Sequence, residues 1–233
     1  MRRSFIIFAL PTLALLSFAL YEALLVAPTE QTMGNVQRIF YYHVSSAWTA
    51  FLLFLVNFVA SIVYLARRSP RWDAVAVTSA EVGVVFCTVV LVTGPLWDRP
   101  VWGIWWTWDA RLTSTLVLWL IYVSYLILRR YASGGQMPVL AAALAIFGFI
   151  DVPIVYFSIR YFRTQHPQPV IAGGEGSGID PAMLQVLLIN WAAFMVFAAL
   201  VCWVRYRLER IRQEFEERQV LESLLEPNVR SSK

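Results

Sequence analysis

The sequence predicts an all-α polytopic membrane protein: a bundle of six transmembrane helices with a tryptophan-rich segment on its outer side. Of its 233 residues, 59% are hydrophobic and only 15% are charged. The mean hydropathy of +0.61 is far above that of an ordinary soluble domain. Six stretches approach the roughly 20 apolar residues that cross a hydrocarbon core. Because an α-helix satisfies its own backbone hydrogen bonds in lipid, these stretches are expected to be helical.

The first three spans are expected at about 4–26, 44–66 and 74–96. The first follows Met1-Arg2-Arg3, as a secretory signal peptide does. Its apolar run is long, however, and no small-x-small cleavage site follows it, so we interpret it as a membrane span. A short arginine-rich turn separates the second span from the third.

The last three spans are expected at about 112–128, 138–158 and 183–204. Pro153 cannot donate a backbone hydrogen bond, so the fifth span is expected to be loosened near Asp151. The sequence HPQPVIAGGEGSGIDPAM, which precedes the sixth span, is rich in glycine and proline. These residues interrupt regular structure, and the segment is expected to be a mobile flap.

A charged tail over residues 205–233 follows the last span. Arg210 and Glu214 stand four residues apart, as do Arg212 and Glu216, which places each pair on one face of a helix. Tails of this kind are typically solvated helices, and the alternative is a helix that docks a cytoplasmic partner.

The distribution of basic residues predicts the orientation in the membrane. The chain has 19 lysines and arginines in total. If both termini are cytoplasmic, fourteen of these residues lie on the inner side and five on the outer side. Since cytoplasmic loops are enriched in basic residues, we expect this orientation. The longer connections, which offer room for a binding site, then face outward.

Polar residues within the expected spans are Glu22, Asn57, Glu81, Asp151 and Asn190. Such groups are costly in lipid and usually face the bundle interior. Asp151 and Asn190 would both lie roughly 10 Å below the outer surface, so they are expected to be partners. A structural hydrogen-bonded contact is the favoured role for these residues, and a proton or substrate pathway is the alternative.

The most unusual stretch is VWGIWWTWDARLTS, residues 101–114. If it is helical, Trp102, Trp105 and Trp106 share one face with Asp109, and Trp97 and Trp108 flank that face. Tryptophans favour the headgroup depth, so an aromatic belt is one interpretation. The other is a platform for a planar ligand, where Gly103 leaves room for close approach.

The only two histidines, His43 and His166, flank the second and fifth expected spans on the same side as the tryptophans. A single interfacial histidine usually makes only hydrogen bonds. Together, however, two imidazoles can ligate a heme iron axially, and indoles can cover the macrocycle. Zinc is disfavoured because the usual three or four clustered ligands are not evident.

Arginines on the outer side are suited to pairing with heme propionates. The residues considered for this role are Arg99, Arg111, Arg160 and Arg163. Contact with lipid phosphates is the alternative for each of them.

Three segments resemble the heme exporter protein C (CcmC) family of cytochrome c maturation. WGIWWTWDARLTS is similar to the tryptophan-rich signature of heme-handling membrane proteins. RIFYYHVSSAW resembles the first histidine segment of the family, with Ser45 where proline is common. FRTQHPQ resembles the second, with Gln165 in place of leucine and Pro167 beside the histidine. The likeness extends from about Met33 to the sixth span.

The resemblance implies a site for heme b at the outer face of the bacterial cytoplasmic (inner) membrane. It implies that His43 and His166 are the axial ligands. The implied heme and chaperone platform consists of Trp102, Gly103, Trp105, Trp106, Trp108 and Asp109. Trp106 and Asp109 are expected to matter more for hand-off than for heme retention. The implied partners are a periplasmic heme chaperone, an ABC-type ATPase with its membrane subunit, and a small single-span membrane protein. No nucleic-acid partner is expected.

Delivery of heme to the chaperone is the preferred function, and the protein is not expected to be an enzyme. A heme lyase is the first alternative, but lyases with this signature resemble larger proteins with more spans and histidines. A transporter of heme or another solute is the second, yet the inner half of the spans offers chiefly Glu81 as a polar group. No Walker motif is present, so ATP coupling would require a partner.

Overall fold

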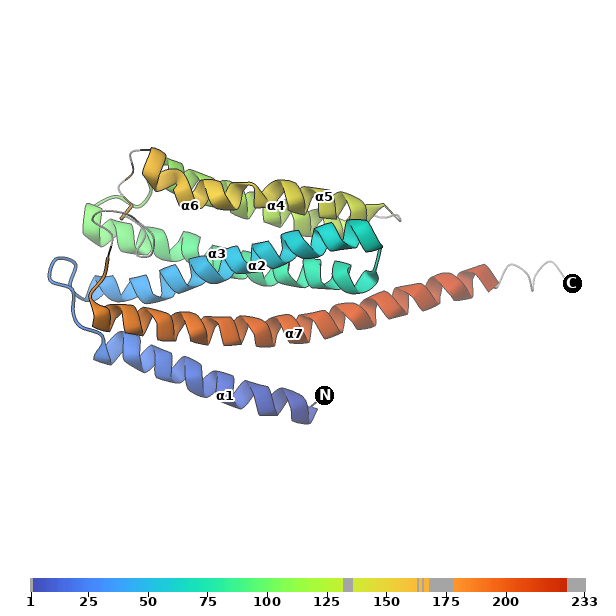
Figure 1. The fold of residues 1–233 in the computed structure, drawn as a ribbon, viewed down its shortest axis with the longest axis horizontal. Helices are drawn as coiled ribbons and strands as arrows, with labels where there is room; N and C mark the ends of the chain where they lie inside the picture. The colour runs from blue at the N-terminus through green and yellow to red at the C-terminus, as the bar shows by residue number, and fades with distance from the viewer. Residues whose placement is uncertain (1, 132–135, 163, 165, 168–177, 226–233) are drawn as a thin grey trace, which may run out of the picture.

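The computed structural model is an elongated bundle of helices that run along a common direction (Figure 1). It describes residues 2–131, 136–162, 164, 166–167 and 178–225. Across these residues the regular structure is helical, and no strand longer than a single bridge is present. Six helices in this part of the chain are long and apolar enough to cross a membrane. The predicted all-α polytopic membrane fold is therefore confirmed.

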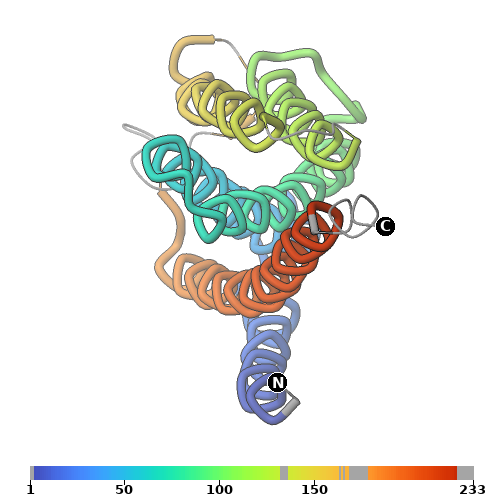
Figure 2. The backbone as a smooth tube through the Cα atoms, turned by 90° about the vertical axis from the view of Figure 1, so that its right-hand side faces the viewer, coloured from blue at the N-terminus to red at the C-terminus, as the bar shows by residue number. Residues whose placement is uncertain are grey.

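The bundle is layered (Figure 2). In chain order its elements are α1 (Arg2–Tyr21), the π-helical turn η1 (Glu22–Val26), the 3-10 turn η2 (Asn35–Arg38), α2 (Ile39–Arg67), α3 (Pro70–Trp102), α4 (Ala110–Tyr131), α5 (Met137–Phe149), α6 (Asp151–Tyr161) and α7 (Pro181–Leu225). Helices α2 and α3 pack along each other in the middle. On one side they contact α4 and α5, with α6 packed on α4, and on the other side they contact α7. Helix α1 packs mainly on α7 and forms the outermost layer.

The connections between helices separate into two groups at opposite ends of the bundle (Figure 1). The histidine end holds residues 27–38, 103–109 and the described part of 162–180. The tail end holds the short link between α2 and α3 and the C-terminal half of α7. Longer connections therefore gather at the histidine end, and its outward orientation stays a prediction.

The tryptophan-rich segment is not helical beyond Trp102, so the predicted shared helical face is wrong. Helix α3 ends at Gly103, whose φ of 76° is left-handed and whose N–H bonds to the Arg99 carbonyl over 3.0 Å. A Cβ at Gly103 would approach only the Arg99 side chain, at 4.0 Å. Glycine is therefore favoured there by its backbone conformation, and the room it leaves for a ligand stays a prediction. The chain becomes helical again only at Ala110.

The fifth span is interrupted between α5 and α6 at Ile150, as predicted. The Ile150 N–H bonds to the Phe147 carbonyl at 3.2 Å, a tighter turn than that of an α-helix. Pro153 lacks the N–H that the Phe149 carbonyl would otherwise accept.

The prediction that Asp151 and Asn190 are partners is wrong. The Asn190 Nδ2 donates to the carbonyls of Ala19 at 3.2 Å and Val186 at 2.9 Å, which joins α7 to α1. Asp151 begins α6, on the opposite side of the α2–α3 layer (Figure 2). Equal depth in the membrane does not specify the direction in which a side chain points around the bundle.

Two other polar residues within the spans also join helices. The Asn57 Nδ2 donates to the Ala76 carbonyl at 2.7 Å, linking α2 to α3. Glu81 accepts two hydrogen bonds from Arg205, at 2.8 and 2.7 Å, linking α3 to α7. These contacts agree with the structural role favoured for such residues.

Helix α7 continues from the last span into the charged tail without a break. The predicted ion pairs Arg210–Glu214 and Arg212–Glu216 form, each with a nitrogen–oxygen distance of 3.4 Å. The tail is therefore helical up to Leu225, and its last residues lie outside the described part of the chain.

A buried ion pair joins α3 to α4 at the tail end. Arg129 on α4 donates from both terminal nitrogens to the two carboxylate oxygens of Asp73 on α3, each at 2.7 Å. Gln213 on α7 adds a hydrogen bond to Asp73 at 3.1 Å. Only 5% of the Arg129 side chain and 9% of the Asp73 side chain are exposed, so water hardly screens this pair.

Arg129→Met is expected to destabilise the protein by about 3–5 kcal/mol, because it leaves the Asp73 carboxylate buried without its cation. Thermal unfolding in detergent measures the loss. Arg130→Met, at the exposed neighbouring position, is the control and should unfold near the wild-type temperature. The double variant Asp73→Leu/Arg129→Met should recover much of the stability. Equal unfolding temperatures for Arg129→Met and Arg130→Met would contradict this role.

Candidate functional site

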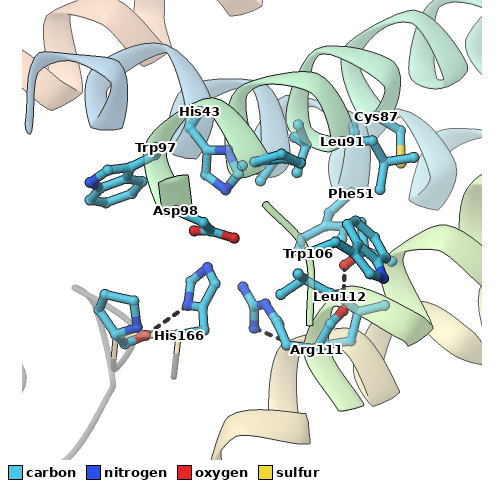
Figure 3. A pocket seen from close by; sticks show the side chains of 18 of the residues that line it. His43, Phe51, Cys87, Leu91, Trp97, Asp98, Trp106, Arg111, Leu112 and His166 are labelled. Atoms are coloured by element: carbon cyan, nitrogen blue, oxygen red, sulfur yellow. Dashed lines mark hydrogen bonds between the residues drawn. The ribbon is translucent and has the colours of Figure 1, made fainter. Parts of the chain in front are cut away.

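A pocket opens at the histidine end between α2, α3, α4 and the segment around His166 (Figure 3). Its empty volume is about 690 Å³, including space that is open to the surroundings. The enclosed cavity itself is only about 50 Å³, so a large planar ligand would have to move the walls apart or lie partly outside it. The walls are mainly apolar and include Ala47, Ala50, Phe51, Leu91, Trp97, Trp102, Trp106, Leu112 and Val155. The polar side chains that line it are His43, Asp98, Arg111, Thr115 and His166.

The two histidines meet in this pocket, with ring centres 6.3 Å apart and ring planes inclined by 39°. An imidazole nitrogen binds a transition metal at about 2 Å, and the ring centre lies about 1 Å behind that nitrogen. Two rings that face one metal ion therefore have centres about 6 Å apart. His43 lies within α2 and not before it, because the helix already begins at Ile39.

The tautomer of His43 is set by a hydrogen bond to Thr93. The His43 Nδ1 lies 2.9 Å from the Thr93 hydroxyl oxygen, and that hydroxyl donates its own hydrogen to the Val89 carbonyl at 2.7 Å. Because the Thr93 hydrogen is already used, Nδ1 must be the donor to its oxygen. The proton is therefore on Nδ1, and Nε2 keeps its lone pair.

His166 has the same tautomer for a different reason. Its Nδ1 lies 2.9 Å from the Pro167 carbonyl oxygen, which can only accept a hydrogen bond. Nε2 again keeps its lone pair. Desolvation in the pocket, together with repulsion by Arg111, lowers the pKa of His166 to about 4. The ring is therefore neutral at neutral pH, the form in which an imidazole can bind a metal.

Two pocket residues at the end of α3 were not predicted as site residues. The buried ring of Trp97 packs edge-on against His43, with centres 6.0 Å apart. The Asp98 carboxyl group points into the space beside both histidines (Figure 3). Gly94, one turn earlier, lies beside the His43 ring, whose Cε1 would be in ordinary contact, at 3.6 Å, with a Cβ there. Extending the helical pattern of α3 beyond residue 96 would have placed these residues on one face.

The predicted tryptophan platform is divided between the pocket and the surface. Trp102 and Trp106 line the pocket. Trp105 and Trp108 are 56% and 75% exposed. Trp106 and Trp108 contact each other edge to face, with ring centres 5.6 Å apart. One indole pair is therefore available to a ligand and the other to the surroundings of the protein.

The predicted propionate arginines occupy different places. Arg111 lines the pocket, where its Nη1 donates to the carbonyls of Val155 at 2.9 Å and Tyr156 at 3.3 Å. Arg99 instead bonds to the Gly103 carbonyl and lies 6.0 Å from the Trp105 ring centre. Arg160 lies 5.4 Å from the Phe157 ring centre. Arg163 is outside the described residues.

Asp109 joins the tryptophan segment to the segment that carries His166. Its Oδ1 accepts a hydrogen bond from the Leu112 N–H at 2.9 Å, as an N-cap of α4 does. Its Oδ2 accepts one from the Thr164 hydroxyl at 2.5 Å. The Thr164 oxygen in turn accepts the His166 backbone N–H at 3.1 Å. Both Asp109 carboxylate oxygens are therefore engaged within the protein.

Comparison with known proteins places these features in a family. The model of the family "Heme exporter protein C" matches residues 1–221. The chain is 34% identical over 216 residues to heme exporter protein C of Bradyrhizobium diazoefficiens, covering 92% of this chain and 82% of that protein. It is 33% identical over 187 residues to heme exporter protein C of Escherichia coli K12, covering 78% and 73%.

A mitochondrial relative is also similar. The chain is 34% identical over 196 residues to a cytochrome c biosynthesis ccmC-like mitochondrial protein of Arabidopsis thaliana, covering 84% of this chain and 74% of that protein. The family model spans nearly the whole chain, including the pocket and both histidines. The chain therefore belongs to the heme exporter protein C family.

Proposed function

We propose that this protein binds heme b in the pocket at the histidine end and delivers it to a periplasmic chaperone during cytochrome c biogenesis. The main support is the pair of imidazoles, which are 6.3 Å apart with both Nε2 lone pairs available. The names of the relatives, heme exporter protein C and cytochrome c biosynthesis protein, point to the same cargo and process.

His43 and His166 would hold the heme iron as its two axial ligands. The bonds from Nδ1 to Thr93 and to the Pro167 carbonyl fix the orientation of each ring and increase the basicity of Nε2. Across the described residues, no three His, Cys, Asp or Glu side chains are placed to share a metal ion. Two imidazoles in an aromatic pocket fit heme iron better than the closed sites of zinc.

The remaining pocket residues suit the two parts of a porphyrin. Trp97, Trp102 and Trp106 offer flat apolar surface to the macrocycle and exclude water from it. Arg111 is a cation at the pocket wall, and among the described residues no carboxylate forms an ion pair with it. Its remaining N–H groups are suited to a propionate carboxylate.

Delivery is favoured over transport through the bundle because described residues between the pocket and the tail end pack in a buried cluster. Below the pocket, Phe54 and Tyr122 stack with ring centres 3.8 Å apart within a buried cluster that includes Leu118. Beyond it lies the Asp73–Arg129 pair. Heme would therefore enter and leave the pocket at the histidine end.

In the proposed setting, the histidine end faces the periplasm of a bacterial inner membrane and both termini are cytoplasmic. The exposed Trp105 and Trp108 would contact the chaperone beside the pocket. An ABC-type ATPase, its membrane subunit and a small single-span protein would complete the assembly. The protein would act as a delivery subunit and not as a heme lyase.

His43→Ala and His166→Ala are each expected to convert heme from six-coordinate to five-coordinate and to weaken its retention at least about tenfold. Absorption spectra and a pyridine-hemochrome assay of the purified proteins measure both effects. Gln31→Ala, an exposed position at the same end, is the control. Unchanged ligation spectra in both histidine variants would exclude the proposed axial roles.

Arg111→Met is expected to weaken heme binding about tenfold or more, since a hydrogen bond to a charged group contributes about 1.5–3 kcal/mol. The matched control is Arg99→Met, which removes an arginine that does not line the pocket. Binding titrations with heme and with its dimethyl ester, which has no carboxylates, test the reason. If Arg111→Met weakens binding of both ligands equally, Arg111 does not pair with a propionate.

Trp105→Ala/Trp108→Ala is expected to slow transfer of heme to the chaperone several-fold while leaving heme content unchanged, because both side chains are exposed. Trp106→Ala is expected to reduce heme content, because its ring lines the pocket. Chaperone pull-down and heme transfer by the purified proteins measure the two steps. Normal transfer by the double variant would remove the docking role of this surface.

A further inference from the structure

We propose that Asp109 and Thr164 are positioning residues that hold His166 in the pocket through a chain of two hydrogen bonds. This inference rests on the proposed function, because it assigns the two residues a role in axial ligation by His166. Asp109 belongs to the tryptophan-rich segment, for which a platform role was predicted. The geometry points to a role inside the protein.

The hydrogen-bond chain begins at Asp109, whose carboxylate is fixed to a membrane helix. The Asp109 Oδ1 accepts the Leu112 N–H at 2.9 Å, and the Asp109 carbonyl accepts the Thr113 N–H at 3.0 Å. Both bonds satisfy donors in the first turn of α4, which fixes the carboxylate relative to that helix. The second oxygen, Oδ2, remains directed at Thr164 and accepts its hydroxyl hydrogen at 2.5 Å.

The second hydrogen bond joins Thr164 to the backbone of His166. A threonine hydroxyl has one hydrogen to donate and two lone pairs with which to accept. Because Thr164 donates to Asp109, its oxygen is oriented to accept the His166 N–H, at 3.1 Å. The backbone of His166 is thereby connected to α4 through two side chains.

The two imidazoles need different kinds of support. His43 is part of α2, so its backbone is held by the hydrogen bonds of a long helix. His166 follows the end of α6 at Tyr161, where Phe162 has an extended conformation. A loop residue can ligate a metal reproducibly only if its backbone is held by other groups. The Asp109–Thr164 chain supplies such a connection.

The directions of these hydrogen bonds explain why the residue at position 109 is an aspartate. Both Asp109 oxygens accept hydrogen bonds. Oδ1 accepts one from a backbone N–H, and Oδ2 accepts one from the Thr164 hydroxyl and a longer one, at 3.4 Å, from the Thr107 hydroxyl. An asparagine at this position could still cap α4 with its one oxygen, but its amide nitrogen would face Thr164 as a donor. Asp109→Asn therefore preserves the shape and the helix cap while it removes the acceptor for Thr164.

The test compares the axial ligation of heme in purified full-length proteins. Thr164→Val removes the hydroxyl with little change of shape, whereas Thr164→Ser keeps it. We expect Thr164→Val to shift bound heme towards the five-coordinate form and to weaken retention about tenfold. Asp109→Asn should have a smaller effect in the same direction, because its amide can still donate to the Thr164 oxygen. Thr164→Ser should give the wild-type spectrum. Thermal unfolding of the heme-free proteins should be similar for all three variants.

A double-mutant cycle shows whether Thr164 acts through His166. Adding Thr164→Val to His166→Ala should cause no further loss of heme, because the residue it supports is already gone. Adding it to His43→Ala should cause a further loss. If Thr164→Val weakens heme binding in the absence of the His166 ring, Thr164 contacts the ligand or the pocket directly, and the proposed route is overturned.

The outcomes also separate this inference from the proposed function. If the wild-type protein shows no two-histidine ligation, or if the histidine variants bind heme unchanged, the proposed function itself is wrong. If both histidines ligate heme while Thr164→Val and Asp109→Asn keep the wild-type spectrum and retention, only the positioning role is wrong.

Discussion

The hydrogen bonds on the two Nδ1 atoms are the interactions on which the candidate site depends. They place the proton of each imidazole on the side away from the pocket, so that both Nε2 lone pairs remain available. The partners are a hydroxyl on α3 and a carbonyl in the segment after α6. The close packing of α2 against α3 and the position of His166 and Pro167 at the pocket are therefore both needed for the proposed metal-binding geometry.

The backbone of the histidine end is held largely by side chains, since regular helices end there. Arg38 donates to the carbonyls of Ala23 and Leu24 at the end of the first span. Asp180 accepts the Ala182 N–H at 2.8 Å and caps the start of α7, as Asp109 caps α4. Helix ends leave backbone groups without intrahelical partners, and these polar residues satisfy some of them. Non-helical backbone is thus concentrated at the histidine end, beside the candidate site.

Features that depend on local pattern could be predicted from the sequence. The membrane fold follows from hydropathy, the interruption at Ile150 from Pro153, and the tail ion pairs from four-residue spacing. Features that depend on direction around the bundle could not. Asp151 and Asn190 share a depth but lie on opposite sides of the central helices.

Prediction of the candidate site from the sequence was limited in the same way. The meeting of His43 and His166 was expected from their common side of the membrane and from family resemblance, and the structure brings the two rings together. Asp98 was missed because α3 extends beyond the apolar run that marked its span. The division of the tryptophans was missed because Gly103 ends the helix on which a common face depended.

Helix α7 has a mechanical consequence for the whole molecule. It is continuous for 45 residues, which at 1.5 Å per residue is about 67 Å, roughly twice the thickness of a hydrocarbon core. Asn190 attaches the first half of this helix to α1 through the Ala19 carbonyl, and Gln213 attaches its other half to Asp73. A stiff helix attached in this way is suited to carrying a change of tilt from one end of the bundle to the other.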